Sequence, residues 1–134
     1  MPFIGLVFLG QSNHNDVTAN REAVIQIAIV GDNKRLKSVK AVIDTGFTGD
    51  LTLPSAMIAE LEFTYRGIQE VILGDGSIQT FEMCVGSVIW DGQVRRVEIN
   101  AAETDSLIGM GLLEGYKLEI EGIEGGAVTI AALS

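Results

Sequence analysis

The sequence contains only one cysteine, one histidine and two prolines in 134 residues. With Cys84 as the single thiol, the chain cannot form an internal disulfide, which is typical of a reducing compartment and leads us to expect a cytoplasmic location. Cys84 lies in an apolar run and His14 in a polar one, so a Cys–His nucleophile is disfavoured. We expect Cys84 to be a buried structural thiol.

Basic residues are scarce as well. Nine Lys and Arg stand against eighteen Asp and Glu, for a net charge of −9. Because phosphate contacts need clustered basic side chains, this composition argues against a nucleic-acid partner.

No apolar stretch approaches the ~20 residues that a membrane-spanning helix needs. The apolar residues 1–10 lack a basic leading segment and are followed by polar residues, so we expect a strand at 3–9 rather than a signal peptide.

Helical patterns are few, and short runs rich in Val, Ile and Phe are separated by Gly, Asp and Asn. Strands are expected at residues 3–9, 23–30, 37–44, 51–53, 68–73, 78–85, 86–90, 93–99, 117–121 and 127–131. Hairpin turns are predicted at 31–33, 74–76 and 91–92, and short helices at 55–61 and 107–114. The pattern predicts one all-β domain over residues 1–134, a small closed barrel or sandwich, with an N-terminal strand and a polar loop in residues 1–22.

One short stretch carries a chemical signal. Residues 41–43 predict the end of a buried strand, and Asp44-Thr45-Gly46 follows directly. An isolated carboxylate buried there is costly. Thr45 can brace the turn through its hydroxyl, and Gly46 permits a sharp bend and the close approach of another segment. The arrangement predicts a rigid turn that presents the Asp44 carboxylate at the floor of a cleft.

The chemistry suited to this carboxylate requires a second one. Two carboxylates at hydrogen-bonding distance share a proton, so that one activates water while the other acts as an acid toward a carbonyl oxygen. No other aspartate of the chain is followed by Thr-Gly or Ser-Gly. These other aspartates are Asp16, Asp32, Asp50, Asp75, Asp91 and Asp105. If Asp44 is catalytic, its partner must therefore come from a second copy of the chain, across a two-fold axis.

Three motifs together resemble the retropepsin-like aspartic proteases, in particular the small single-domain bacterial members related to retroviral proteases. The first is the stretch from Ala41 to Gly46, with Leu51-Thr52-Leu53-Pro54 after it. The second is Leu73-Gly74-Asp75-Gly76-Ser77, where the family has a flap hairpin. The third is Leu107-Ile108-Gly109, followed by a short helical segment. The resemblance covers about residues 23–131.

The resemblance implies an acid-protease-like barrel with one or two short helices. It also implies an aspartic endopeptidase that acts as a homodimer on peptides or proteins and uses no cofactor. The catalytic motif is then Asp44, Thr45 and Gly46. Residues expected to bind substrate are Phe47, Gly74, Asp75, Gly76 and Ser77, and residues expected to support the site are Ile108 and Gly109.

The sequence departs from the retroviral pattern at two positions. Thr48 and Met110 stand where those enzymes often carry an Asp and an Arg that brace the dimer. Because both charges are absent together, no orphaned charge is left, but the dimer brace must differ. Phe47 replaces a small residue, and it either narrows the cleft or lines it as an apolar wall.

Two other functions are compatible with the sequence. A non-catalytic β module with the same fold would bind peptides or assemble with a partner, and replacing Asp44 with Asn would then change nothing measurable. A carboxylate-only site for Ca²⁺ or Mg²⁺ at Glu70, Asp75 and Glu82 is a weaker alternative, because these residues are expected to be solvated and no His or Cys cluster accompanies them.

Overall fold

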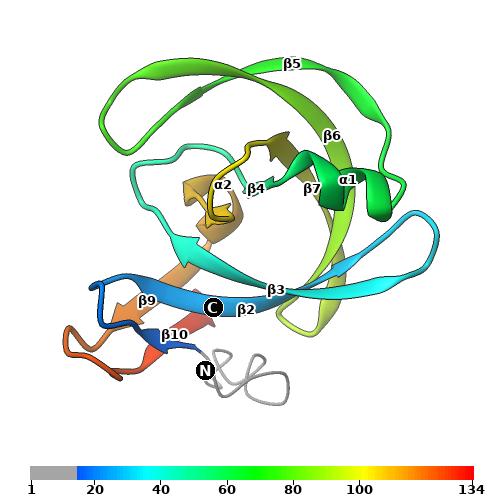
Figure 1. The fold of residues 1–134 in the computed structure, drawn as a ribbon. Coiled ribbons are helices and arrows are strands. Elements are labelled where there is room, and N and C mark those ends of the chain that lie inside the picture. Colours follow the sequence, from blue (N-terminus) through cyan, green and yellow to red (C-terminus); the bar gives the residue numbers. More distant parts are fainter. Residues whose placement is uncertain (1–14) are drawn as a thin grey trace.

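The computed structural model describes residues 15–134, so the strand expected at residues 3–9 and His14 lie outside the described part of the chain. Ten strands and two short helices form the described part (Figure 1). The strands are β1 (Asp16–Val17), β2 (Ala23–Val30), β3 (Leu36–Ile43), β4 (Leu51–Leu53), β5 (Tyr65–Ile72), β6 (Ile78–Trp90), β7 (Gln93–Ala101), β8 (Leu107–Ile108), β9 (Tyr116–Ile120) and β10 (Val128–Ala132). The helices are α1 (Ser55–Glu60) and α2 (Met110–Leu113).

Eight strands form one sheet that closes on itself. Their order is β1-β2-β3-β8-β4-β7-β6-β5, and β2 also pairs with β6, with Ile29 opposite Val88. This extra pairing joins the second strand from each end of the sheet and closes the ring visible in Figure 1. Strands β9 and β10 form a separate antiparallel hairpin. The all-β, barrel-like architecture predicted from the sequence is therefore confirmed.

The core follows from strand alternation in β2. Ile25, Ile27 and Ile29 lie on one face of the strand and are completely buried, while Gln26 on the opposite face is half-buried. Each of these isoleucines contributes about 1.5–3 kcal/mol through burial of apolar surface. Trp90 from the end of β6 fills the same interior and meets Tyr116 edge to face, with ring centroids 5.7 Å apart.

Several predicted boundaries differ from the structure. The two strands expected at 78–85 and 86–90 are one continuous strand, β6, because Gly86 lets the strand pass closely over Ile99 and Phe63. A strand, β1, lies inside the stretch expected to be a loop, because Asp16 pairs with Val24. The helix expected at 107–114 begins only at Met110.

The cause of this last difference is a strand inserted between two others. In β8, Leu107 and Ile108 pair in parallel with Val42 and Ile43, and Ile108 also lies opposite Leu51 in β4. These pairings join segments about sixty residues apart in the chain and override the local helical pattern. The expected helix after Pro54 is present as α1, and each of the three expected hairpin turns joins an antiparallel pair of strands. Within residues 15–134, neither helix is long or apolar enough to cross a membrane.

Candidate active site

Asp44 lies directly after β3, where the backbone holds it on two sides. Its N–H donates to the carbonyl of Ile108 at 2.9 Å, and its own carbonyl accepts the N–H of Phe47 at 3.1 Å. The carboxylate is half-buried, and its Oδ1 accepts the N–H of Gly46 at 3.0 Å. The turn therefore fixes the direction of the carboxylate, as a group that must meet a reacting atom requires.

The start of α2 supports the loop that follows this turn through hydrogen bonds to its backbone. The N–H groups of Gly109 and Met110 donate to the carbonyls of Asp50 and Phe47 at 3.1 and 2.8 Å. A Cβ on Gly109 would lie 2.3 Å from the carbonyl oxygen of Gly49, so only glycine fits this approach. Ile108 and Gly109 thus contact the loop that carries the Asp44 turn, in the place where the sequence predicts support.

Phe47 lies inside the protein rather than in the cleft. Its side chain is fully buried, and its ring fills the space beside Gly49 and Gly109. A ring without exposed surface does not contact a peptide in this conformation, which corrects the expectation that Phe47 narrows or lines the cleft. Phe47 instead provides the apolar support for the loop that follows Asp44.

A hairpin tip covers Asp44. We define the flap as β5, residues 78–84 of β6 and the tip at residues 73–77; Figure 1 shows it as a long hairpin. A Cβ on Gly74 would lie 3.1 Å from the Asp44 Oδ1 and 3.3 Å from its Oδ2. A Cβ on Gly46 would lie 2.5 Å from the Cα of Gly74. The backbone of the flap tip therefore rests on the Asp44 turn, and the contact at Gly46 leaves no room for a side chain.

Asp75 and Ser77 shape the flap tip. The Asp75 Oδ1 accepts the Ser77 hydroxyl at 2.6 Å and the Ser77 N–H at 2.9 Å. These two hydrogen bonds, the hydroxyl bond first, lower the pKa of the exposed Asp75 carboxyl. Gly76 completes the turn with a φ of 85°, and its N–H donates to the carbonyl of Leu73. Asp75 therefore stays ionised and holds the tip in a defined shape.

Thr48 has a role that the sequence did not reveal. Its N–H donates to the carbonyl of Ile72 at 3.2 Å, and its Oγ1 accepts the N–H of Ile72 at 3.2 Å. This reciprocal pair fastens the base of the flap to the loop after Asp44. The two residues are 24 positions apart in the chain, so no local pattern signals the contact.

Asp50 is a second site-supporting residue that the motifs do not mark. Its Oδ2 accepts the N–H of Glu98 in β7 at 2.9 Å, and its carbonyl accepts the N–H of Gly109. A Cβ on Gly111 would lie 2.3 Å from the Asp50 Oδ1. Asp50 therefore joins the loop after Asp44 to both β7 and α2.

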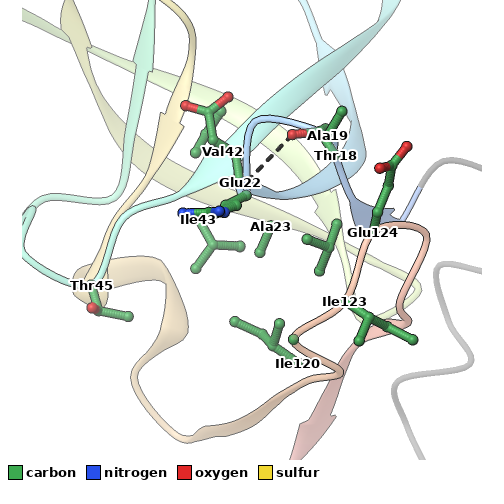
Figure 2. Close-up of a pocket in the computed structure, with 13 residues that line it drawn as sticks. Thr18, Ala19, Glu22, Ala23, Val42, Ile43, Thr45, Ile120, Ile123 and Glu124 are labelled. Carbon is green, nitrogen blue, oxygen red and sulfur yellow. Dashed lines mark hydrogen bonds between the residues drawn. The ribbon is translucent and has the colours of Figure 1, made fainter.

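Thr45 faces outward. The sequence predicts that its hydroxyl braces the turn, but no residue between 15 and 134 hydrogen-bonds this hydroxyl; the Gly46 and Phe47 N–H groups hold the turn instead. Thr45 borders a cavity of about 630 Å³ together with Ile43, Ile120 and Ile123 (Figure 2). Ile120 and Ile123 are 46% and 68% exposed, so this side of the molecule presents an apolar surface next to the Asp44 turn.

A second cavity, of about 570 Å³, lies beneath the flap. Its walls come from the flap, β4, the segment after β7 and the start of β8. The lining residues are Thr52, Ser55, Leu73, Gln79, Thr80, Phe81, Glu82, Ala101, Ala102, Glu103, Thr104 and Leu107. Leu73 precedes the Gly74 that covers Asp44, and Leu107 precedes the Ile108 that binds the Asp44 backbone, so this cavity adjoins the candidate active site.

The other candidate sites do not form. Cys84 is fully buried, and burial, with a smaller contribution from Asp32, raises the pKa of its thiol to about 11, so it is unsuited to act as a nucleophile. In the described part of the chain, no three His, Cys, Asp or Glu side chains come close enough to hold a metal ion. Glu70, Asp75 and Glu82 therefore do not form the metal site considered from the sequence.

Comparisons with known proteins give one similarity. No family model matches the chain, and no curated protein matches it. Among solved structures, it is similar to the crystal structure of a retropepsin-like aspartic protease from Rickettsia conorii, with a TM-score of 0.48 and 19% sequence identity. The similarity covers 84% of each chain.

Proposed function

We propose that this protein is an aspartic endopeptidase that acts as a homodimer, with one Asp44 from each subunit in the catalytic dyad. The observation that carries the proposal is the contact between Asp44 and the flap. A carboxylate with a fixed direction lies at a strand end, beside a hairpin tip so close that a Cβ on Gly74 would lie 3.1 Å from its Oδ1. A peptide held between tip and carboxylate would have its backbone next to the reacting group.

The need for a second subunit follows from the surroundings of Asp44. Within residues 15–134, the one hydrogen bond to its carboxylate comes from the Gly46 N–H. A single carboxylate cannot serve as both base and acid in the same step. Two Asp44 carboxylates sharing one proton would supply both functions.

The surface beside Thr45 is suited to the second copy. The exposed Ile120 and Ile123 border the same cavity as Thr45, one residue from Asp44 (Figure 2). Burial of these side chains against the same surface of a partner would favour association. It would also bring the two Asp44 turns toward a common axis, and it would replace the charged brace absent at Thr48 and Met110.

The proposed reaction uses this geometry in a simple order. The flap tip lifts from Asp44, and an extended peptide enters and pairs with backbone groups of the flap as an added strand. Water between the two carboxylates loses a proton to the ionised one and attacks the peptide carbonyl. The protonated carboxyl donates to the carbonyl oxygen. The carboxyl that now holds the proton protonates the amide nitrogen, while the other carboxylate takes a proton from a hydroxyl of the tetrahedral intermediate. The C–N bond breaks, the new carboxylic acid and the amine leave, and the dyad again holds one proton.

Cleavage of a diverse peptide library, followed by mass spectrometry, tests the proposal. The wild-type protein is expected to cleave fastest at acidic pH, because the dyad must hold one proton. Asp44→Asn should lower the rate by at least about 10²–10⁴-fold while leaving folding and dimerisation intact. Asp105→Asn is the matched control, because Asp105 is exposed and its carboxylate has no hydrogen-bond partner among the described residues.

Two results would contradict the proposal. The first is equal cleavage by Asp44→Asn and wild type. The second is a protein that stays monomeric in sedimentation experiments at concentrations where it cleaves. If the wild type cleaves nothing and Asp44→Asn leaves every other property unchanged, the non-catalytic module becomes the supported function.

A further inference from the structure

The cavity beneath the flap combines an apolar interior with acidic groups at its edge. Leu73, Phe81 and Leu107 supply apolar surface from three different elements. The cavity has two charged lining residues, Glu82 and Glu103, and both are acidic. Its volume of about 570 Å³ lies within the range of small-ligand pockets, so a long side chain fits inside.

Glu103 is held in place at the cavity edge. Its Oε1 accepts the N–H of Ser55 at 2.8 Å and the Ser55 hydroxyl at 2.5 Å, and Ser55 also lines the cavity. These hydrogen bonds, that from the Ser55 hydroxyl first, lower the pKa of the exposed Glu103 carboxyl. Its Oε2 accepts no hydrogen bond from residues 15–134.

Neither acidic residue is neutralised within the subunit. The ion pairs in the described part of the chain join Lys37 to Glu60, Arg96 to Asp32 and Lys117 to Glu119. Glu82 and Glu103 take part in none of these ion pairs. Two unpaired carboxylates beside apolar walls are matched by a cation on a flexible aliphatic stem.

The floor of the cavity adds a further acceptor. Thr52 is 1% exposed, and its Oγ1 accepts the N–H of Leu107 at 2.9 Å. A hydroxyl oxygen has two lone pairs, so one remains for a donor inside the cavity. The ring of Phe81 is also suited to lie against a cation.

We propose that this cavity is a substrate subsite for a lysine or arginine side chain, with Glu103 and Glu82 as specificity-determining residues. The aliphatic stem lies along Leu73, Phe81 and Leu107, and the cationic end reaches the carboxylates. A glutamate side chain of the substrate is repelled there. The inference rests on the proposed function, because it assigns the substrate class of the same cleft.

The residues found around the bonds cleaved in a peptide library test this subsite. Wild-type protein is expected to show Lys and Arg enriched at one fixed distance from the cleaved bond. Matched peptides with Lys, or with norleucine, which keeps the aliphatic stem but lacks the ammonium group, should then differ about tenfold in kcat/KM, mostly through KM. Because the two glutamates are exposed, this preference should shrink as the salt concentration rises.

Substitutions separate a specificity role from a structural one. Glu103→Gln and Glu82→Gln should each lower kcat/KM for the Lys peptide more than for the norleucine peptide, and so reduce the preference for Lys. Glu114→Gln is the matched control, because Glu114 is an exposed glutamate outside the cavity lining. A Glu103→Gln protein that cleaves both peptides more slowly by the same factor would indicate a structural role and overturn the inference.

The inference and the proposed function can fail separately. Cleavage without Lys or Arg enrichment, or with a preference that survives both substitutions, overturns the subsite and leaves the endopeptidase intact. If no peptide is cleaved, the endopeptidase fails, and the same library is then selected for binding to the protein. Enrichment of Lys and Arg that Glu103→Gln abolishes would still support the subsite, whereas equal binding of all peptides would overturn it.

Discussion

Gly46 and Gly74 meet backbone to backbone beside the Asp44 carboxylate. A methyl group on Gly46 would lie 2.5 Å from the Cα of Gly74 and 3.2 Å from its carbonyl oxygen. The two glycines come from the loop after β3 and from the flap tip, about thirty residues apart in the chain. The distance between flap and carboxylate therefore depends on both positions lacking a side chain.

Gly46→Ala is expected to push the flap tip away from Asp44. Because the neighbouring atoms are backbone, they cannot rotate aside, and we expect a loss of about 1–3 kcal/mol in unfolding free energy and at least tenfold in kcat/KM. Urea denaturation and peptide cleavage measure the two effects. Gly122→Ala is the control for the unfolding free energy, because a Cβ there meets no atom within 4 Å. Equal behaviour of the two variants would contradict the close contact.

Gly109→Ala should reduce stability rather than act on the flap. Its Cβ would lie 2.3 Å from the carbonyl oxygen of Gly49 and 2.6 Å from that of Phe47, so the loop after Asp44 must move. We expect a loss of about 2–4 kcal/mol, in the upper range of single substitutions. Thermal unfolding monitors the loss, and an unfolding midpoint within one degree of the wild type would show that the loop is not tightly supported.

Thr48→Val tests the link between the flap base and the Asp44 loop. Valine keeps the shape of threonine but cannot accept the N–H of Ile72, so the flap should loosen by about 0.5–1.5 kcal/mol. Hydrogen exchange at the Ile72 amide should become faster, while Thr48→Ser, which keeps the hydroxyl, should exchange like the wild type. Unchanged hydrogen exchange at the Ile72 amide in Thr48→Val would contradict the link between the flap base and the loop after Asp44.

The pH dependence of stability should reveal Cys84. Its pKa rises from an ordinary value of 9.0 to about 11 in the folded protein, because burial disfavours the thiolate. The folded state therefore holds the proton more tightly than the unfolded state between these values, and stability falls as pH rises through this window. The stability of the folded protein does not depend on Cys84 titration below about pH 8. Cys84→Ala should remove this alkaline loss, and the native thiol should resist thiol reagents at pH 8 while the unfolded chain reacts.

Asp75 gives the pH dependence of stability the opposite sign from Cys84. Its pKa is lowered by the Ser77 hydrogen bonds, so the stabilisation of the tip is complete above the ordinary value of 3.8 and is lost as pH falls below it. An NMR titration should show the Ser77 amide signal shifting at a pH below 3.8. Asp75→Asn should abolish that shift, and a midpoint at or above 3.8 in the wild type would contradict the assignment.

The parts of the fold that depend on neighbouring residues were predictable from the sequence. Alternation places Ile25, Ile27 and Ile29 in the core, and the turn residues around Asp91-Gly92 join β6 to β7. The Asp44 motif was also recognisable, because a strand end, a carboxylate and a glycine follow one another in the chain.

The parts that depend on distant residues were not predictable. Ile108 forms a strand because it finds Ile43 and Leu51 on either side, although its own segment favours a helix. Phe47 follows a polar turn, and nothing in the sequence shows that Gly49 and Gly109 leave an interior space for its ring. In the sequence, Thr48 is notable only because it stands where retroviral proteases often carry an aspartate. Its contact with Ile72 depends on how the flap folds back onto the loop after Asp44.

Strand β6 runs without interruption for 13 residues, from Ile78 at the flap to Trp90 in the core. Its first half pairs with β5 and its second half with β7. The flap and the wall of the barrel therefore share one continuous strand. A hinge between them must consist of a bend along this strand rather than a flexible joint. Changes near Trp90, where the strand ends in the core, would then alter how readily the strand bends at the flap.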